Sequence, residues 1–100
     1  MQPEPVKSIF NEKIMLKIKY SGKASKQFVG IHKGDKKSAE MIIRAVEGYS
    51  KDPFGHFDIK ILKGKPAKFK RLRIGDYRII FEDDKVTMWI YEIKHRQEAY

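Results

Sequence analysis

Hydrophobic and polar residues alternate in several stretches of the chain, a period of two that is typical of half-buried β-strands. The clearest alternation opens the ordered part of the sequence, where Ile14, Leu16, Ile18 and Tyr20 are separated by polar residues or methionine. Later stretches are rich in β-branched and aromatic residues, which also favours strands. The pattern predicts strands at residues 14–20, 59–61, 69–74, 77–82 and 86–93.

Between the first two strands the apolar residues instead recur every three to four positions, which indicates amphipathic helices. Ser21 is a good N-cap for a helix over residues 22–33, and Asp35 is one for a second helix after the break at Gly34. Pro53 and Gly55 end the second helix. The apolar stripe of the second helix comprises Ala39, Ile42, Ile43, Val46 and Tyr49.

This order of elements predicts an α+β fold: an N-terminal strand, a helical hairpin and then an antiparallel β-meander. The dipeptides Gly75-Asp76 and Asp83-Asp84 are the expected two-residue turns of the meander. Both helices should pack on one face of the sheet, because each has a single apolar stripe. Residues 1–12 contain two prolines and no period, so we expect a flexible lead-in followed by a single domain over residues 13–100.

The two expected turns also predict which strand residues are neighbours. They place Arg73 opposite Arg78, Arg78 opposite Trp89, and Phe81 opposite Val86. One face should then form the core, with Leu72, Ile74, Tyr77, Ile79, Phe81, Val86, Met88 and Ile90. The opposite face should present Arg71, Arg73, Arg78, Ile80, Thr87, Trp89 and Tyr91.

The net charge of +9 points to an anionic partner, of which nucleic acid is the commonest. Seven of the 22 Lys and Arg residues lie between Lys60 and Arg73, where there is no acidic residue, and the other fifteen nearly balance the 13 acids. A basic surface that only aids solubility is the alternative. The local concentration of the charge favours a binding site.

Arg73 opposite Arg78 needs a physical explanation, because like charges facing each other across two strands destabilise a sheet. An acid such as Glu82 or Glu92 could lie between them. Alternatively, the two guanidinium groups bind phosphate oxygens, while Trp89 or Tyr91 offers a ring on which a base stacks. The basic residues that lead into the same strand favour the second explanation.

Several classes of chemistry are excluded or lack a motif. The chain has no cysteine, which removes disulfides, thiolate metal sites and cysteine nucleophiles and fits a reducing compartment. It has no apolar run long enough for a membrane span and no secretory signal pattern. No histidine spacing suggests a metal site, and no Gly-rich phosphate loop is present. We therefore expect no cofactor, no metal and no membrane partner.

Five segments together carry a family resemblance that covers about residues 14–100. The sequence resembles the RelE/ParE superfamily of toxins from type II toxin–antitoxin systems. The most specific match combines RLRIGDYRIIF with a downstream HR…Y ending. The five segments are KIKYSGKASKQF, SAEMIIRAVEGYSKDP, ILKGK, RLRIGDYRIIF and HRQEAY.

The resemblance implies a microbial ribonuclease-like fold and a cytoplasmic, ribosome-dependent messenger RNA endoribonuclease. In such toxins the 2′-hydroxyl attacks the adjacent phosphorus without a metal, and a cognate antitoxin covers the basic face. By position, the resemblance assigns catalytic roles to Arg78, Arg96, Tyr100, Arg71 and His95. The residues expected to contact RNA are Lys65, Lys68, Lys70, Arg73, Trp89 and Tyr91.

Two other functions share this fold. ParE-like members of the superfamily inhibit DNA gyrase and lack the nuclease residues. A basic nucleic-acid-binding module without catalysis is the other alternative, since a fold alone does not decide function. The arginines at positions 71, 73, 78 and 96, together with Tyr100, favour the nuclease over the ParE-like function.

Overall fold

The computed structural model describes residues 15–62 and 69–98 of the chain. The predicted lead-in over residues 1–12 and three predicted site residues, Lys65, Lys68 and Tyr100, lie outside the described residues.

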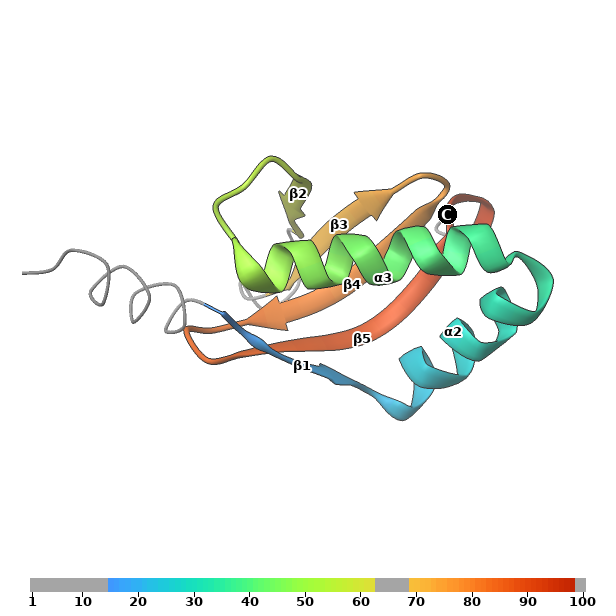
Figure 1. Ribbon diagram of the computed structural model, residues 1–100, viewed down its shortest axis with the longest axis horizontal. Helices are drawn as coiled ribbons and strands as arrows, with labels where there is room; N and C mark the ends of the chain where they lie inside the picture. Colours follow the sequence, from blue (N-terminus) through green and yellow to red (C-terminus); the bar gives the residue numbers. More distant parts are fainter. Residues whose placement is uncertain (1–14, 63–68, 99–100) are drawn as a thin grey trace, which may run out of the picture.

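Five strands form one sheet in the order β1-β5-β4-β3-β2 (Figure 1). Strands β2 to β5 pair antiparallel in sequence order, which confirms the predicted meander. β1 joins the far edge and runs parallel to β5, a pairing that the local pattern did not indicate. The bounds are β1 Lys17–Tyr20, β2 Asp58–Ile61, β3 Lys70–Ile74, β4 Tyr77–Asp83 and β5 Thr87–His95.

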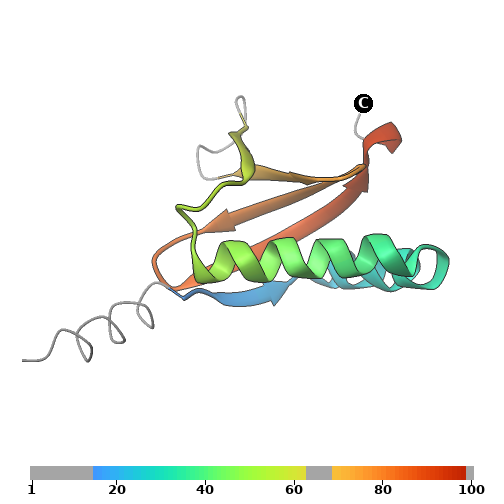
Figure 2. The same cartoon turned by 45° about the horizontal axis from the view of Figure 1, so that its top comes forward.

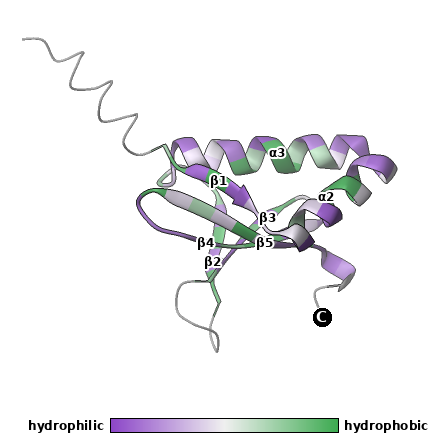
Figure 3. Ribbon diagram, turned by 90° about the horizontal axis from the view of Figure 1, so that it is seen from below, coloured by the Kyte–Doolittle hydropathy of each residue, from purple (hydrophilic) through white to green (hydrophobic). Residues whose placement is uncertain are grey.

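Two helices cover one face of this sheet, as expected (Figures 2 and 3). Helix α2 spans Gly22–Gly34 and helix α3 spans Lys36–Lys51. The predicted caps are confirmed: Ser21 accepts a hydrogen bond from the backbone N–H of Ala24 at 2.9 Å, and Asp35 accepts one from the N–H of Ser38 at 3.1 Å. A short 3-10 helix, η1 (Arg96–Glu98), follows β5.

The core lies between the helices and the sheet. Ile42, Val46 and Tyr49 of the predicted α3 stripe are buried there, as are most of the predicted strand positions. Val86 is the exception, since it is 57% exposed in the β4–β5 turn and not in the core. The buried cluster comprises Leu16, Ala24, Ile42, Val46, Tyr49, Leu72, Ile79, Phe81, Met88, Ile90 and Ile93.

The predicted register is right for one hairpin and wrong for the next. Arg73 lies opposite Arg78 across β3 and β4, as predicted for the two-residue turn at Gly75-Asp76. In the β4–β5 hairpin, however, Arg78 lies opposite Lys94 and not Trp89, and Phe81 lies opposite Ile90 and not Val86.

Two local features cause this difference. The Asp84 carboxylate accepts hydrogen bonds from the N–H groups of Val86 and Thr87 at 2.7 and 2.8 Å, which makes a longer turn than two residues. In addition, β5 contains a β-bulge, in which Tyr91 is the extra residue between the partners of Ile80 and Phe81. Together they move the partners of β4 along β5.

Candidate functional site

The face of the sheet that no helix covers is the candidate site, and we call it the open face. Its centre is a row of three cationic residues on adjacent strands: Arg73 on β3, Arg78 on β4 and Lys94 on β5. Directly opposed side chains in such a row have Cβ atoms about 4.5–5.5 Å apart. Positive charges at this spacing can attract an anion.

The arginines of β3 have different surroundings. Arg71 is held by a 2.8 Å ion pair between its Nη2 and Asp58 Oδ1, and its side chain is only 15% exposed. Arg73, two residues further on the same face, is exposed and makes no ion pair with any residue in the described ranges. Asp58 lies opposite Arg73 in the register, but its carboxylate bonds to Arg71. Arg73 therefore keeps its charge available.

Glu82 and Glu92 are the two acids that could lie between Arg73 and Arg78 according to the sequence, and each bonds to a residue of β5 or α2. Glu82 accepts a hydrogen bond from the Tyr91 hydroxyl at 2.7 Å. Glu92 forms ion pairs with Lys23 of α2 at 2.9 Å and with Lys94 at 3.7 Å. Glu92 thus reduces the charge at one end of the row, and neither acid pairs with Arg73.

Two aromatic residues of β5 lie further along the open face from the row. Trp89 is half-buried and faces Glu82, which lies four residues along β4 from the predicted neighbour Arg78. Tyr91 is exposed in the bulge, and its ring meets the edge of Phe69 at a centroid distance of 5.3 Å. The hydrogen bond to Glu82 raises the pKa of the Tyr91 hydroxyl above its ordinary value.

Lys70, a predicted RNA-binding residue, points to the helix side of the sheet. Its Nζ donates to Asp83 Oδ1 at 3.0 Å, and Tyr49 donates its hydroxyl proton to the other oxygen of Asp83 at 2.6 Å. These residues line a groove of about 880 Å³ between the end of α3 and the β4–β5 turn. Lys70 is thus separated from the row by the sheet itself.

His95 also lies on the helix side. Its ring meets the Tyr77 ring edge-on at 5.1 Å, and both line a cavity of about 380 Å³ beside α2. The His95 Nδ1 accepts the N–H of Gln97 at 3.2 Å, so a neutral imidazole carries its proton on Nε2. The structure therefore does not bring His95 to the face that carries Arg78.

Arg96 lies at the end of the sheet nearest the row. Its N–H donates to the carbonyl of Asp76 at 2.7 Å, and its Nε is 3.7 Å from the Asp76 carboxylate. This places the start of the C-terminal segment beside the β3–β4 turn (Figure 1). Arg96 is more than half exposed and adds a further cation at this end.

Lys94 is the residue of the row that the sequence pattern did not predict. The strand containing it was expected to end at residue 93, and only the bulge at Tyr91 turns Lys94 to the open face. The described residues contain no group of three or more His, Asp or Glu side chains arranged for a metal. Within the same ranges, no helix has the length and apolarity that crossing a bilayer requires.

The arrangement as a whole suits a phosphodiester. The three cations of the row can contact phosphate oxygens and stabilise negative charge that develops on them. An exposed Tyr91 and a half-buried Trp89 provide ring surfaces for bases further along the same face. The described part of the open face offers carboxylates but no histidine for proton transfer.

Comparison with known proteins identifies the family. The family described as the ParE toxin of the type II toxin–antitoxin system parDE matches residues 18–100. No curated protein matches the sequence.

Solved structures with the same fold include several toxins. The YoeB dimer from Staphylococcus aureus has a TM-score of 0.72 at 20% identity, covering 81% of this chain and 97% of that one. A YoeB/ParE toxin from Agrobacterium tumefaciens has 0.70 at 15% identity, with 80% and 98% covered. The archaeal RelE–RelB complex from Pyrococcus horikoshii OT3 has 0.66 at 24% identity, with 85% and 99% covered. These likenesses confirm the predicted fold.

Proposed function

The chain belongs to the ParE toxin family of type II toxin–antitoxin systems, and we propose that this toxin cuts messenger RNA on the ribosome. The observation that carries the proposal is the row of Arg73, Arg78 and Lys94 on the open face. A row of like charges is unfavourable for the sheet alone, and a phosphate group would reverse that penalty.

In the proposed reaction the 2′-hydroxyl of the RNA attacks the adjacent phosphorus and loses its proton, while the bond to the 5′-oxygen breaks and that oxygen gains a proton. The products are a 2′,3′-cyclic phosphate and a 5′-hydroxyl end. Arg78, at the middle of the row, stabilises the negative charge that grows on the phosphate oxygens. Arg73 and Lys94 hold the phosphate from either side, and Trp89 stacks on a base.

For proton transfer we propose Tyr100 of the C-terminal segment, while the guanidinium of Arg96, which stays protonated, adds positive charge near the phosphate. Arg96 lies at the end of the sheet beside the row, and Tyr100 follows it by four residues. Both roles rest on the resemblance to RelE-like toxins. Arg71 supports the site by fixing Asp58, and the proposal leaves out His95 and Lys70 because both lie on the helix side.

The proposal includes partners and a location. Ribosomes and messenger RNA lie in the cytoplasm, and we propose that location for the chain. A cognate antitoxin is expected to cover the open face, because a protein of charge +9 would otherwise bind nucleic acids unspecifically. Several structural neighbours were solved as complexes with an antitoxin, among them RelE–RelB and YoeB–YefM.

Inhibition of DNA gyrase is the second candidate, and the family match to the parDE toxin favours it. The two functions differ in what Arg78 does. A nuclease requires its charge at the reacting phosphate, whereas a protein-binding toxin has no such requirement.

The test compares the wild-type chain with Arg78→Ala and with Arg44→Ala, a matched control at an exposed arginine of α3. Each protein is added to a translating extract, and messenger RNA 5′ ends are mapped. We expect the Arg78→Ala variant to cut about 10²–10³-fold more slowly, as when one preorganised donor is removed from a transition-state site. Arg44→Ala should cut at the wild-type rate.

Thermal denaturation of both variants separates loss of catalysis from loss of folding. Full cleavage by a folded Arg78→Ala variant would remove Arg78 from the mechanism. If the wild-type chain generated no ends on translated messages but blocked supercoiling by purified gyrase, the second candidate would replace the first.

A further inference from the structure

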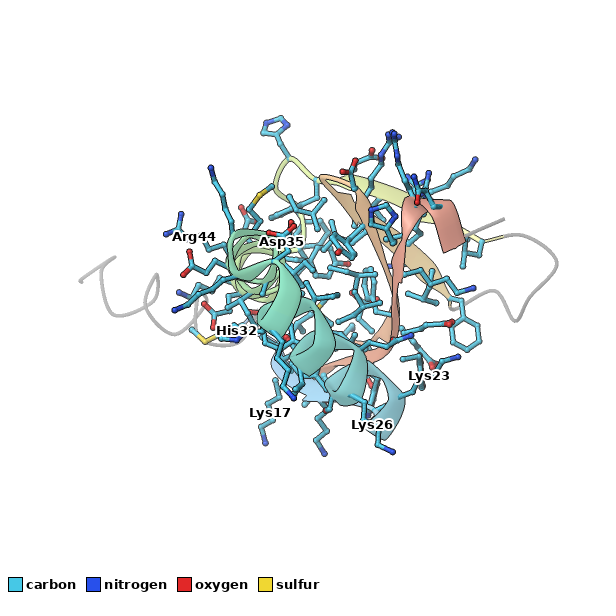
Figure 4. The ribbon with its side chains drawn as sticks, turned by 90° about the vertical axis from the view of Figure 1, so that its right-hand side faces the viewer. Lys17, Lys23, Lys26, His32, Asp35 and Arg44 are labelled. Atoms are coloured by element: carbon cyan, nitrogen blue, oxygen red, sulfur yellow. The ribbon has the colours of Figure 1, made fainter. Side chains whose placement is uncertain are left out.

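A second basic surface lies next to the open face, at the edge formed by β1 and the start of α2. It consists of Lys17 and Lys19 on β1 and of Lys23 and Lys26 on α2, and we call it the lysine edge. In Figure 4, Lys17, Lys23 and Lys26 point outward along the same side of the molecule. None of these lysines was a site candidate in the sequence.

The lysine edge is continuous with the open face. Lys19 is in register with Trp89 of β5, so its side chain lies beside that aromatic residue on the helix-free side. Lys23 binds one oxygen of Glu92, and Lys94 of the cationic row lies 3.7 Å from the other. A chain of charged groups thus leads from the row to α2.

Most of the charge at this edge is not neutralised within the protein. Lys17, Lys19 and Lys26 are exposed, and none forms an ion pair with the residues that the structure describes. Only Lys23 has an acidic partner, and its side chain is still 65% exposed. An anion from outside the chain can therefore reach all four ammonium groups.

The start of α2 is an unfavourable place for lysines. A helix N-terminus carries a partial positive charge and is stabilised by acidic residues. The first turn of α2 contains no acidic residue, and its N-cap is the neutral Ser21, whereas α3 begins at the carboxylate of Asp35. The positive helix end and the lysines together attract an anion, which is a second reason to expect a partner here.

From this continuity we infer that the lysine edge binds the phosphodiester backbone of the same RNA strand whose reacting phosphate lies on the Arg73–Arg78–Lys94 row. The inference rests on the proposed function for the identity of the ligand. Lysine contacts phosphates as a point charge and reads no sequence, so the edge adds affinity for longer RNA and no base preference. The row binds the phosphate that reacts, and the lysine edge binds the flanking nucleotides.

The test is a binding measurement that does not depend on cleavage. Single-stranded RNAs of about four and about twelve nucleotides are titrated with the protein, and binding is followed by fluorescence anisotropy. Both lengths lie within the range that small single-strand-binding domains cover. All RNAs carry 2′-O-methyl groups, so that no 2′-hydroxyl can react. The variants are K17Q/K19Q/K26Q and a control of equal charge, K37Q/K51Q/K85Q, whose lysines are exposed on α3 and the β4–β5 turn.

We expect wild type and control to bind the longer RNA more tightly than the shorter one. In K17Q/K19Q/K26Q this advantage should vanish, while the affinity for the short RNA stays within about twofold. The dependence of log affinity on log salt for the long RNA should become less steep by about 2, since each phosphate contact on a single strand contributes about 0.7. Arg78→Ala, in contrast, should weaken the binding of both lengths.

Equal losses in the two triple variants would mean that only net charge matters and would overturn the inference. The inference would also be overturned if K17Q/K19Q/K26Q still bound the longer RNA more tightly than the shorter one by the wild-type factor. The same holds if this variant lost affinity only for an RNA hairpin duplex and not for single-stranded RNA. If no variant or wild type bound the RNAs while binding to purified gyrase was found, the proposed function itself would fail, which is a different result.

Discussion

Neutralising Arg73 should stabilise the fold while it weakens the site, and this combination distinguishes a functional arginine from a structural one. Arg73 lies directly opposite Arg78, and such a like-charge pair costs about 0.2–1 kcal/mol. On its other side Asp58 lies in register, but the 2.8 Å bond to Arg71 uses that carboxylate. Arg73→Gln should therefore raise the free energy of unfolding by about 0.2–1 kcal/mol.

The matched control is the same substitution two residues away on the same strand. Arg71→Gln removes a short ion pair and exposes a hydrogen-bonding group of Asp58, so it should lower the free energy of unfolding by about 0.5–1.5 kcal/mol. For a domain of this size, each kcal/mol corresponds to a change in Tm of about 4–8 °C. The two variants should thus shift the Tm in opposite directions.

Salt provides the second readout. The Debye length falls from about 10 Å at 0.1 M to about 3 Å at 1 M, so repulsion between exposed charges is screened at high salt. The gain in Tm of Arg73→Gln should therefore shrink as salt is added, while its RNA cleavage rate stays below the wild-type rate throughout. If Arg73→Gln lowered the Tm at low salt, Arg73 would be a structural ion-pair partner, and the argument for a phosphate site would be refuted.

Two further changes test the fold that positions the site. Tyr49→Phe keeps the buried ring but loses the hydrogen bond to Asp83, which should lower the free energy of unfolding by about 1.5–3 kcal/mol in urea denaturation. Tyr91→Phe, which removes the exposed hydrogen bond to Glu82, should lower it far less. Burial and the Asp83 carboxylate raise the pKa of Tyr49 above its ordinary value of about 10. The stability that the protonated hydroxyl contributes is therefore complete below about pH 10 and is lost as the pH rises further. The Tyr49→Phe variant should lack this loss of stability at alkaline pH. Gly75→Ala should lower stability by about 1–2 kcal/mol, because Gly75 has a φ of +57°; an unchanged Tm would contradict this reading of the β3–β4 turn.

The elements and the first hairpin were predictable because their signals are local. Ser21 and Asp35 cap their helices through hydrogen bonds that span three residues, and Gly75 supplies the positive φ that a two-residue turn needs. Because the interacting residues are close in the sequence, a local sequence pattern indicates these interactions. The Arg73–Arg78 pair follows directly from that turn.

The second hairpin was not predictable in the same way. The bulge in β5 carries no local sequence signal, and the amide oxygen of Gln27 accepts the N–H of Ile93 from 66 positions away at 2.7 Å. The same is true of the parallel pairing of β1 with β5, which depends on where two distant segments meet. Lys94 and the lysine edge were missed for this reason.

The bulge also decides which chemistry the open face contains. Side chains alternate along a strand, so without the extra residue at Tyr91 the positions after it would change faces. Ile93 would then lie opposite Arg78, His95 would lie on the open face, and Lys94 would face the helices. With the bulge, His95 packs on Tyr77 and the row gains a third cation. In the proposed mechanism the sheet therefore binds and polarises the phosphate, and proton transfer comes from residues beyond its last strand. This separation explains why the RelE-like assignment of Arg78 fits the open face while that of His95 does not.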